Sequence, residues 1–415
     1  MPVQTDHSPP HIAERRLDLD WIRIAAFGLL ILYHVGMLYV SWGFHVKSAH
    51  RLRELEPLML LLNPWRMALL FLVSGAATRF MLAKYDVGAF ARRRSARLLI
   101  PLAFGMLVVV PPQSWAEIVE KLGFSGGYLD FWFGHYLAFD QSFCRIANGR
   151  QVCIILPTWN HLWFVAYLWL YTMVLAGLLA LAPTLAARAE PLLERALPGL
   201  LLLTAPALLL GLNRFLIFPA APPTYIVVGD WYQHALYGFC FLFGFLAARS
   251  QALAERTERL RWLALALAAM AFLATLWLRA QPQGEFQRLV RPFVYGLDQW
   301  CWIVAILGFA RRHLSRRDGP VRRYLVEAVF CWYIVHQTAI ILAAHWLKPL
   351  ALPAGQEAAL VIAITALSCA ATYEIARRVG WLRPLFWIAA DPRGRLPASC
   401  PPPSNAPATS SSVRR

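Results

Sequence analysis

Long apolar runs separated by short polar segments dominate the sequence. Each run is long enough to cross the hydrocarbon core of a bilayer as a helix, so the pattern predicts an all-α, polytopic membrane protein with about ten transmembrane helices. One membrane domain is expected over 20–378, between a polar N-terminal tail at 1–19 and a cytoplasmic, disordered C-terminal tail at 379–415. The predicted spans are 20–42, 57–83, 97–115, 159–182, 198–218, 231–248, 262–280, 292–310, 324–347 and 356–378.

Composition agrees with this pattern. Of the 415 residues, 59% are hydrophobic and 15% are charged, whereas soluble domains carry about 25% Asp, Glu, Lys and Arg, so an ordinary soluble globule is excluded. The first apolar run begins at Trp21 and is long enough to span, so we expect it to be retained rather than cleaved as a signal peptide. The run 97–115 is expected to end at Pro111 and Pro112, because proline disrupts a helix interior.

Positive charge is unevenly distributed among the polar segments. The chain has 40 Lys and Arg against 23 Asp and Glu, a formal net charge of +17, which in a soluble protein would suggest a nucleic-acid partner. Here an N-in, C-in arrangement places most of the Lys and Arg in the cytoplasm, as the positive-inside rule requires. We therefore expect the lipid bilayer as a partner and no nucleic acid. The six arginines of 311–323 indicate an anchor beside anionic lipid, the alternative being a site for donor phosphates.

Residues 116–158 form the largest outer loop under this topology, and the loop is rich in aromatic residues. It contains Cys144 and Cys153, which either form a disulfide, since the outer side of a bacterial inner membrane is oxidising, or are two unrelated thiols. The seven cysteines show no CxxC and no Cys/His spacing typical of a metal site, so no metal is predicted. The sequence also lacks a phosphate loop, an HExxH motif, a GxSxG elbow and a dinucleotide fingerprint.

Ionisable side chains within the apolar runs are the candidate functional groups, because they are costly in a membrane unless they are paired or face a polar cavity. Arg23 and His34 are 11 residues apart in the first span, which places both on one helix face, about 16 Å apart along the axis. Asp20 precedes Arg23 on this face and is expected either to orient it or to cap the helix. For His34 the alternative is a neutral, hydrogen-bonded histidine of the bundle core.

Arg66 and His336 lie at similar depths in two other spans. Arg66 runs inward from the outer face and is expected to meet His34, the alternative being that its side chain reaches back to the outer interface. His336 lies about twelve residues into its span, and His34 about thirteen residues from Trp21. Because the two spans run parallel, both histidines are expected to face one pocket. A satisfied core histidine is the alternative for His336 as well.

Aromatic residues and a histidine mark the outer start of the fourth span. Trp159, Trp163 and Tyr167 recur every four residues and therefore share a helix face. They fit either the interfacial aromatic belt of a membrane protein or a platform on which a sugar stacks. His161 lies at the same mouth and is a candidate substrate contact.

Arginines cluster before the third span, on the predicted cytoplasmic side. Arg92, Arg93, Arg94 and Arg97 are explained by positive-inside anchoring. They are explained equally well by a phosphorylated donor, because the guanidinium fork matches phosphate oxygens. The residues alone do not decide between the two.

Five segments resemble the membrane acyltransferase-3 family. DWIRIAAFGLLILYH, FLVSG, RRRSARLLIP, NHLWFV and YIVHQ occur in the order seen in that family, and the resemblance runs from about Asp20 to about Arg378. Within the family, GFCFLFGFLAARS and VVVPPQSW are most similar to the glucan-modifying branch that includes periplasmic-glucan succinyltransferases. We expect no soluble hydrolase-like domain after the spans, as in single-domain members.

The resemblance implies a ten-span enzyme of the bacterial inner membrane that transfers an acyl group from cytoplasmic acyl-CoA to a hydroxyl of a glycan or other small acceptor, commonly across the membrane. By motif match, Arg23 and His34 take the positions of the family's arginine and histidine pair, and Arg94 and Arg97 those of its Arg-x-x-Arg pair. Acyl-CoA is expected as donor substrate, with no permanently bound cofactor. The candidates are His34, Arg23 and Arg66 for catalysis, Arg93, Arg94 and Arg97 for acyl-CoA, and His336, His161 and Trp163 for substrate.

Several alternatives stay open. His34 is either the base that takes the acceptor proton or the carrier of the acyl group, with Arg66 or Arg23 opposite the developing oxyanion. The acyl group is acetyl or succinyl, and the oligomeric state is open. A transporter or flippase of a sugar-containing or lipid-linked solute is the leading alternative function, with Asp298 as its candidate coupling carboxylate. A non-catalytic assembly subunit is the third.

Overall fold

The computed structural model describes residues 16–147 and 149–388, and these are mostly helical. The helices are α1 (Leu17–Gly36), α2 (Glu56–Leu62), α3 (Arg66–Leu82), α4 (Val87–Phe104), α5 (Pro111–Leu122), α6 (Tyr128–Phe131), α7 (Trp163–Leu181), α8 (Leu185–Ala196), α9 (Leu201–Leu216), α10 (Trp231–Ala247), α11 (Gln251–Ala280), α12 (Glu285–Leu314), α13 (Pro320–Leu347) and α14 (Ala354–Arg378). The shorter 3-10 and π-helical turns are η1 (Arg53–Leu55), η2 (Gly105–Val109), η3 (Trp132–Tyr136), η4 (Asn160–Leu162), η5 (Lys348–Leu350) and η6 (Gly380–Phe386). Strands β1 (Cys144–Ala147) and β2 (Arg150–Cys153) form an antiparallel hairpin.

Helices long and apolar enough to cross a membrane dominate the described part of the chain. Eight such helices or continuous helical stretches are present, and α8 with α9 makes a ninth if this pair, bent by 106°, is one broken span. The predicted span 231–248 corresponds to α10, which has 17 residues and is not among these eight helices. The prediction of an all-α, polytopic membrane protein is confirmed, while the number ten and the N-in, C-in orientation stay predictions.

The third predicted span does not end at its prolines. It begins earlier, because α4 starts at Val87, where the Asp86 side chain accepts a hydrogen bond from the Ala89 amide (2.9 Å). Pro111 and Pro112 lie in the first turn of α5, where a helix does not need their missing amide hydrogens. The helical course therefore continues through η2 into α5, and the predicted end was wrong. The arginine cluster likewise lies within α4 rather than before a helix.

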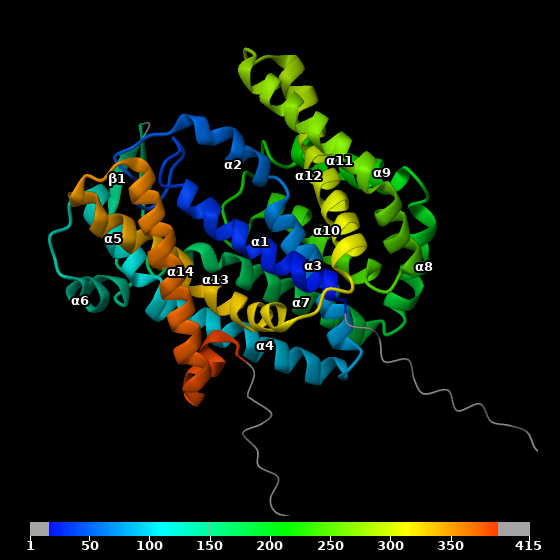
Figure 1. The fold of residues 1–415 in the computed structure, drawn as a ribbon, viewed down its shortest axis with the longest axis horizontal. Helices are drawn as coiled ribbons and strands as arrows, with labels where there is room; N and C mark the ends of the chain where they lie inside the picture. Colours follow the sequence, from blue (N-terminus) through cyan, green and yellow to red (C-terminus); the bar gives the residue numbers. More distant parts are fainter. Residues whose placement is uncertain (1–15, 148, 389–415) are drawn as a thin grey trace, which may run out of the picture.

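Helix α1 occupies the middle of the bundle, where it packs against α13, α12 and α3 (Figure 1). Helix α3 is the most enclosed of these partners, since residues 67–73 are all buried. A helix that is apolar around its whole circumference belongs in such an interior position. Helices α1, α3 and α13 thus form the rigid centre from which the polar residues of the first, second and ninth predicted spans project.

Helices α3 and α10 cross with their backbones in close approach. A Cβ atom on Gly75 would lie 1.9 Å from the carbonyl oxygen of Phe241, and one on Gly244 would lie 1.9 Å from that of Leu72. Glycine is required at both positions, because any side chain would separate the helices. The crossing holds α3, and with it Arg66 at its first residue, against the bundle.

The aromatic segment between α5 and α7 folds over one end of the bundle (Figure 1). Cys144 pairs with Cys153 across the hairpin, and the two sulfur atoms form a disulfide. Of the two alternatives for these cysteines, the structure therefore has the bonded pair. Phe131 and Tyr136 are buried in a small apolar cluster with Leu156, which attaches this segment to the helices.

The packed region continues past the boundary expected at residue 379. After α14, the turn η6 packs against α4 and α14, and Phe386 is buried. Phe386 is an apolar anchor within the stretch that was expected to be a disordered tail. At the other end, α1 already begins at Leu17. The rest of the expected tails, 1–15 and 389–415, lies outside the described residues.

Candidate active site

Two histidines from helices that are far apart in the sequence meet in the centre of the molecule. His34 on α1 and His336 on α13 lie 2.9 Å apart, from Nδ1 to Nε2, and their rings are stacked with centroids 5.1 Å apart. The Nδ1 atom of His336 is 2.7 Å from the Tyr333 carbonyl oxygen, which only accepts, so this nitrogen carries the proton. With both rings neutral, Nε2 of His336 then accepts from Nδ1–H of His34. The Nε2 atom of His34 is left with its lone pair.

The third histidine belongs to the same polar group. His161 is buried, its Nε2 donates to the Ile334 carbonyl (3.0 Å), and its ring centroid lies 5.1 Å from that of His336. Its unprotonated Nδ1 faces the amide nitrogen of Gln113 at 3.4 Å. His161 is therefore held as a fixed tautomer by two neighbours, and its contact with a substrate stays a prediction.

Gln113 connects these histidines to the loops around them. It is fully buried on α5, its amide nitrogen donates to the Thr338 hydroxyl (2.7 Å), and its oxygen accepts from Asn160 and Gln337 (both 3.1 Å). All polar atoms of this amide thus have partners, so the network is rigid. A buried amide of this kind stabilises one arrangement of α5, α13 and the start of α7.

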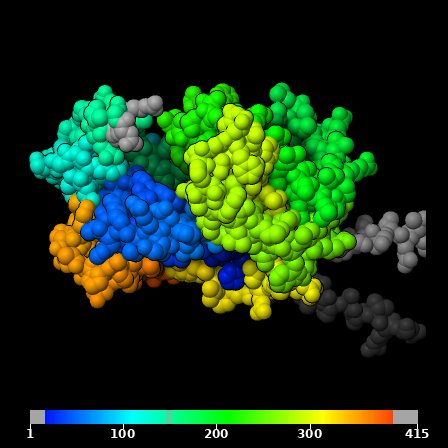
Figure 2. Space-filling view, turned by 90° about the horizontal axis from the view of Figure 1, so that it is seen from above, coloured from blue at the N-terminus to red at the C-terminus, as the bar shows by residue number. Residues whose placement is uncertain are grey.

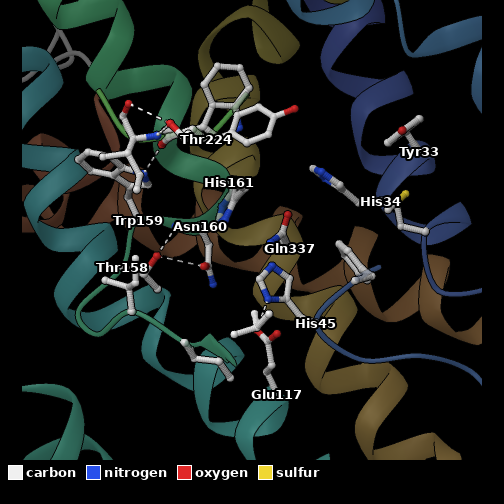
Figure 3. Close-up of a pocket in the computed structure, with 18 of the residues that line it drawn as sticks. Tyr33, His34, His45, Glu117, Thr158, Trp159, Asn160, His161, Thr224 and Gln337 are labelled. Carbon is white, nitrogen blue, oxygen red and sulfur yellow. Dashed lines mark hydrogen bonds and ion pairs between the residues drawn. The ribbon is translucent and has the colours of Figure 1, made fainter. Parts of the chain in front are cut away.

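A cavity of about 630 Å³ opens beside His34. Figure 2 shows a hollow in this region of the surface, between the blue segment after α1 and the cyan and green segments. His34, His161, His45 and Gln337 lie around a common space in Figure 3. His336 is fully buried behind His34 and is not part of the cavity wall. The polar residues of the wall include Tyr33, His34, His45, Asn63, Arg66, Glu117, Lys121, Arg145, Asn160, His161, Tyr225 and Gln337.

Arg66 faces this cavity from the start of α3. Its guanidinium lies 3.5 Å from the centroid of the Tyr33 ring, and its side chain is buried. Within the described residues, its Nε and Nη1 atoms have no hydrogen-bond partner. An arginine that is buried, stacked on an aromatic face and only partly hydrogen-bonded keeps donors available for a negative group in the cavity. The side chain is therefore enclosed by the protein, and its depth in the membrane stays a prediction.

A histidine and carboxylate pair lies on another wall of the cavity. His45 Nδ1 donates to Glu117 at 2.5 Å, and the second oxygen of Glu117 accepts from Lys121. The carboxylate fixes the imidazole orientation, as in hydrolase triads. The sequence analysis missed this pair, because both residues fall outside the predicted spans. It also missed Gln113, Asn160 and Gln337, although these stand within or beside the quoted motifs.

The comparison with known protein families decides the class of the protein. A family model described as "Acyltransferase domain", of the acyltransferase-3 family, matches residues 16–375. The chain belongs to this acyltransferase family. Neither a curated protein nor a solved structure matches the chain in the other two comparisons. The protein is thus a membrane acyltransferase, and the cavity is its candidate active site.

The helix face that carries Trp159, Trp163 and Tyr167 points into the acyltransferase. Trp163 lines the cavity, and its ring lies 4.9 Å from Tyr225 and 5.4 Å from Tyr237 between centroids. Tyr167, one turn further, donates its hydroxyl hydrogen to Asp230 at 2.6 Å. The face therefore packs against the segment between α9 and α10 and does not form a lipid-facing aromatic belt.

The other predicted arginines of the acyltransferase lie apart from this cavity. Arg23 donates to the Val326 carbonyl (3.1 Å) and lies 3.9 Å from Asp20, which also accepts from Arg322. On α4, Arg94 is buried over the Trp387 ring (5.1 Å), and the charges that act on it are those of Arg97 and Arg23. Arg93 and Arg97 are exposed on the same helix. Together with Arg23, which lies three helical turns from His34 along α1, the arginines of α4 form a second basic group.

Asp298, the candidate coupling carboxylate, lies away from the cavity. Asp298 is fully buried on α12 beside Trp302 and does not line the cavity. In the described part of the chain, no three His, Cys, Asp or Glu side chains are grouped so as to hold a metal ion.

Proposed function

We propose that the protein is an O-acyltransferase that moves an acyl group from cytoplasmic acyl-CoA to a hydroxyl of a glycan or other small acceptor at or beyond the outer face of the bacterial inner membrane. The observation that carries the proposal is the oriented pair of His34 and His336 beside a polar cavity that also contains Arg66. O-acylation needs a base for the hydroxyl proton and a positive group for the oxyanion, and these residues supply both.

In this mechanism His34 is the base. Its Nε2 takes the proton of the acceptor hydroxyl while the oxygen attacks the thioester carbonyl of the acyl-CoA. The negative charge of the tetrahedral intermediate develops next to Arg66. The intermediate then collapses, the carbon–sulfur bond breaks, and the imidazolium of His34 returns the proton to the leaving thiolate. The products are the ester and CoA–SH, so atoms and charge balance.

His336 acts as a positioning residue in this scheme. It is fully buried and holds Nδ1–H of His34 through its own Nε2. Its orientation is in turn set by the Tyr333 carbonyl. This differs from the substrate contact expected from the sequence, because a side chain behind the cavity wall cannot touch the acceptor. We propose the role of base for His34, although an acyl carrier would use the same Nε2 lone pair, which lies on the side away from His336.

Arg94, Arg97 and Arg93 are proposed to bind the phosphates of acyl-CoA at the cytoplasmic end, with Arg23 between this group and the cavity. Support comes from the position of Arg23 and Arg94, whose charges act on one another near the start of α1. This placement requires the N-in, C-in topology, with α10 and the bent pair α8 and α9 completing ten spans. Acyl-CoA is then a substrate, and no bound cofactor is needed.

On the acceptor side, Trp163 and His161 are proposed to contact the glycan. Trp163 offers a ring in the cavity wall on which the apolar face of a sugar can stack. The donor acyl group is proposed to be acetyl or succinyl, and the resemblance to the glucan-modifying branch favours a glucan as the acceptor. The protein would be a multi-pass component of the cytoplasmic membrane.

A sided assay tests this proposal. The full chain is reconstituted in proteoliposomes with labelled acetyl-CoA or succinyl-CoA on one side and a glucan oligosaccharide only on the other. We expect the label to appear as an ester on the glucan when the donor faces the predicted cytoplasmic side. Movement of unmodified oligosaccharide across the membrane, without ester formation, would instead establish the transporter.

A further inference from the structure

A second cavity lies next to the active site. It has a volume of about 280 Å³ and is lined by residues of α9, α10, α11 and α12. Asn63, Tyr225 and Tyr237 line both cavities, so these side chains form the partition between them. Tyr225 lies close enough to Arg66 for the two side chains to interact electrostatically. A ligand group in the second cavity is therefore only one side chain away from the active site.

Three arginines converge on this cavity from three helices. Arg214 lies near the end of α9, Arg279 in the last turn of α11 and Arg291 in the second turn of α12. The charges of Arg279 and Arg214 both act on Arg291. Bringing three positive groups together in this way costs free energy through their mutual repulsion. The arrangement needs a compensating negative charge.

The protein itself does not supply that charge at short range. Among the described residues, none of the three arginines has a carboxylate within 4.0 Å, and the lining of the cavity includes no Asp or Glu. By contrast, Arg79 on α3 forms an ion pair with Glu190. The partners that the three arginines do have are neutral: Arg214 donates to the Tyr232 hydroxyl (3.0 Å) and Arg291 to the Gln283 side-chain oxygen (2.7 Å).

The charge of Arg279 also acts on Glu56, whose carboxylate is hydrogen-bonded to Ser41. The Glu56 carboxylate accepts hydrogen bonds from both the hydroxyl (2.5 Å) and the amide (3.1 Å) of Ser41. Asp298 is buried on the same helix as Arg291 but is not part of the cavity wall. Within the described residues, neither carboxylate forms an ion pair with the three arginines or lines their cavity.

Arg214 is the fixed element of this group. Its guanidinium lies 3.9 Å from the centroid of Tyr295 and 4.5 Å from that of Phe218, so the plane of the fork is held by two rings. Guanidinium groups held in this way bind carboxylate and phosphate oxygens through paired hydrogen bonds. Arg279 is exposed and Arg291 half-buried, so both can reorient towards a ligand.

We infer that the second cavity binds an anionic group, a carboxylate or a phosphate, that is carried by a substrate of the neighbouring active site. The inference rests on the proposed function and adds to it a preference for negatively charged substrates. The charged group is either the distal carboxylate of a dicarboxylic acyl chain or an anionic substituent of the acceptor. Both present an oxyanion to three arginines that have no carboxylate partner within the described part of the chain.

A binding measurement tests the site without any need for acyl transfer. The full chain in phosphatidylcholine nanodiscs is titrated with radiolabelled inorganic phosphate and, separately, succinate. We expect saturable binding that the double variant Arg279→Gln/Arg291→Gln weakens by about tenfold or more. Arg214 stays in place because its ring contacts are part of the packing. Equal binding by wild type and double variant, or no saturable binding by wild type, would overturn the inference.

The matched control is Arg288→Gln. Arg288 lies on α12 one turn before Arg291, is 74% exposed, lies 3.7 Å from Glu285 and does not line the cavity. The substitution removes one positive charge from the same region, and the variant protein should bind phosphate like the wild type. Repeating the titration in phosphatidylglycerol nanodiscs separates the possible sources of the anion. Loss of phosphate binding there would assign the site to a lipid headgroup and overturn its link to the substrate.

Kinetics then connect the site to the reaction. The double variant should raise the ratio of KM for a charged substrate to KM for its neutral counterpart by about tenfold, measured with succinyl-CoA against acetyl-CoA and with a phosphorylated against a neutral glucan. The pair that shows the change identifies which substrate carries the anion. An unchanged ratio for both pairs contradicts the inference. Absence of all transfer by wild type would count against the proposed function, while the binding result still decides the site.

Discussion

His34 Nδ1 and His336 Nε2 are separated by 2.9 Å, although the two residues lie 302 positions apart in the chain. Because the Tyr333 carbonyl fixes the proton on His336, the direction of this hydrogen bond is determined, and His34 keeps an unprotonated Nε2. The pair acts as a base whose tautomer is set by the second imidazole and a backbone carbonyl. This relationship is the basis of the first prediction.

Replacing His336 should impair catalysis without affecting donor binding. We expect His336→Ala to lower kcat by about 100-fold, because His34 loses the acceptor that fixes its tautomer, with little change in the KM for acyl-CoA. His336→Gln should recover part of the loss, since its side-chain oxygen approaches the position of Nε2. A loss that is the same for both variants, with normal expression, would speak against a positioning role.

Arg66 should be required for the transition state rather than for binding. We expect Arg66→Gln to lower kcat by about 100-fold or more, as expected when an oxyanion-stabilising group is removed. Arg66→Lys should rescue poorly, because lysine cannot reproduce the stacked fork over Tyr33. Arg79→Gln, at the other end of α3 and paired with Glu190, is the matched control. Steady-state kinetics of the three variants measure the effect, and a fully active Arg66→Gln protein would refute it.

The crossing of α3 and α10 should not tolerate a methyl group. Gly75→Ala or Gly244→Ala should destabilise the protein by at least about 1–3 kcal/mol, because each new Cβ meets a backbone carbonyl. Gly177→Ala, on an exposed face of α7 with open space around it, should be neutral or slightly stabilising. Thermal unfolding in detergent compares the variants. Equal melting temperatures for Gly75→Ala and Gly177→Ala would show that the close approach is wrong.

Cysteine labelling can determine the orientation in the membrane. Among the described residues, the four free cysteines are buried, and Cys144 with Cys153 forms the disulfide near the hairpin. In intact cells, we expect an impermeant maleimide to label this pair only after reduction, because the N-in, C-in topology places the hairpin outside. Cys400 of the C-terminal segment should react only after permeabilisation. The variants Cys144→Ser/Cys153→Ser and Cys400→Ser assign each signal, and the opposite pattern would reverse the topology.

Part of the site was predictable because an α-helix has a constant rise per residue. Counting along two apolar runs placed His34 and His336 at one depth, and the structure brings them into contact. Counting could not show that His336 lies behind the cavity wall, since this depends on the rotation of α13 about its axis. The end predicted at Pro111 failed because proline is also compatible with a first helical turn.

Residues outside the apolar runs could not be placed from the sequence. His45 and Glu117 belong to two segments outside the predicted spans, so their contact depends on the path of the chain after α1 and on the extension of α5. Arg214, Arg279 and Arg291 were not among the residues that the sequence singled out. Only the packing of α9, α11 and α12 brings them around one cavity.

Acyl transfer by a His34→Ala protein is the most direct test of the central claim, that this histidine takes the acceptor proton. Membranes with matched amounts of wild type, His34→Ala and the control His313→Ala, which changes an exposed histidine near the end of α12, are supplied with labelled acetyl-CoA or succinyl-CoA. We predict that label enters the glycan fraction with wild type and His313→Ala, and not with His34→Ala. Labelling by His34→Ala at the wild-type rate would contradict the account.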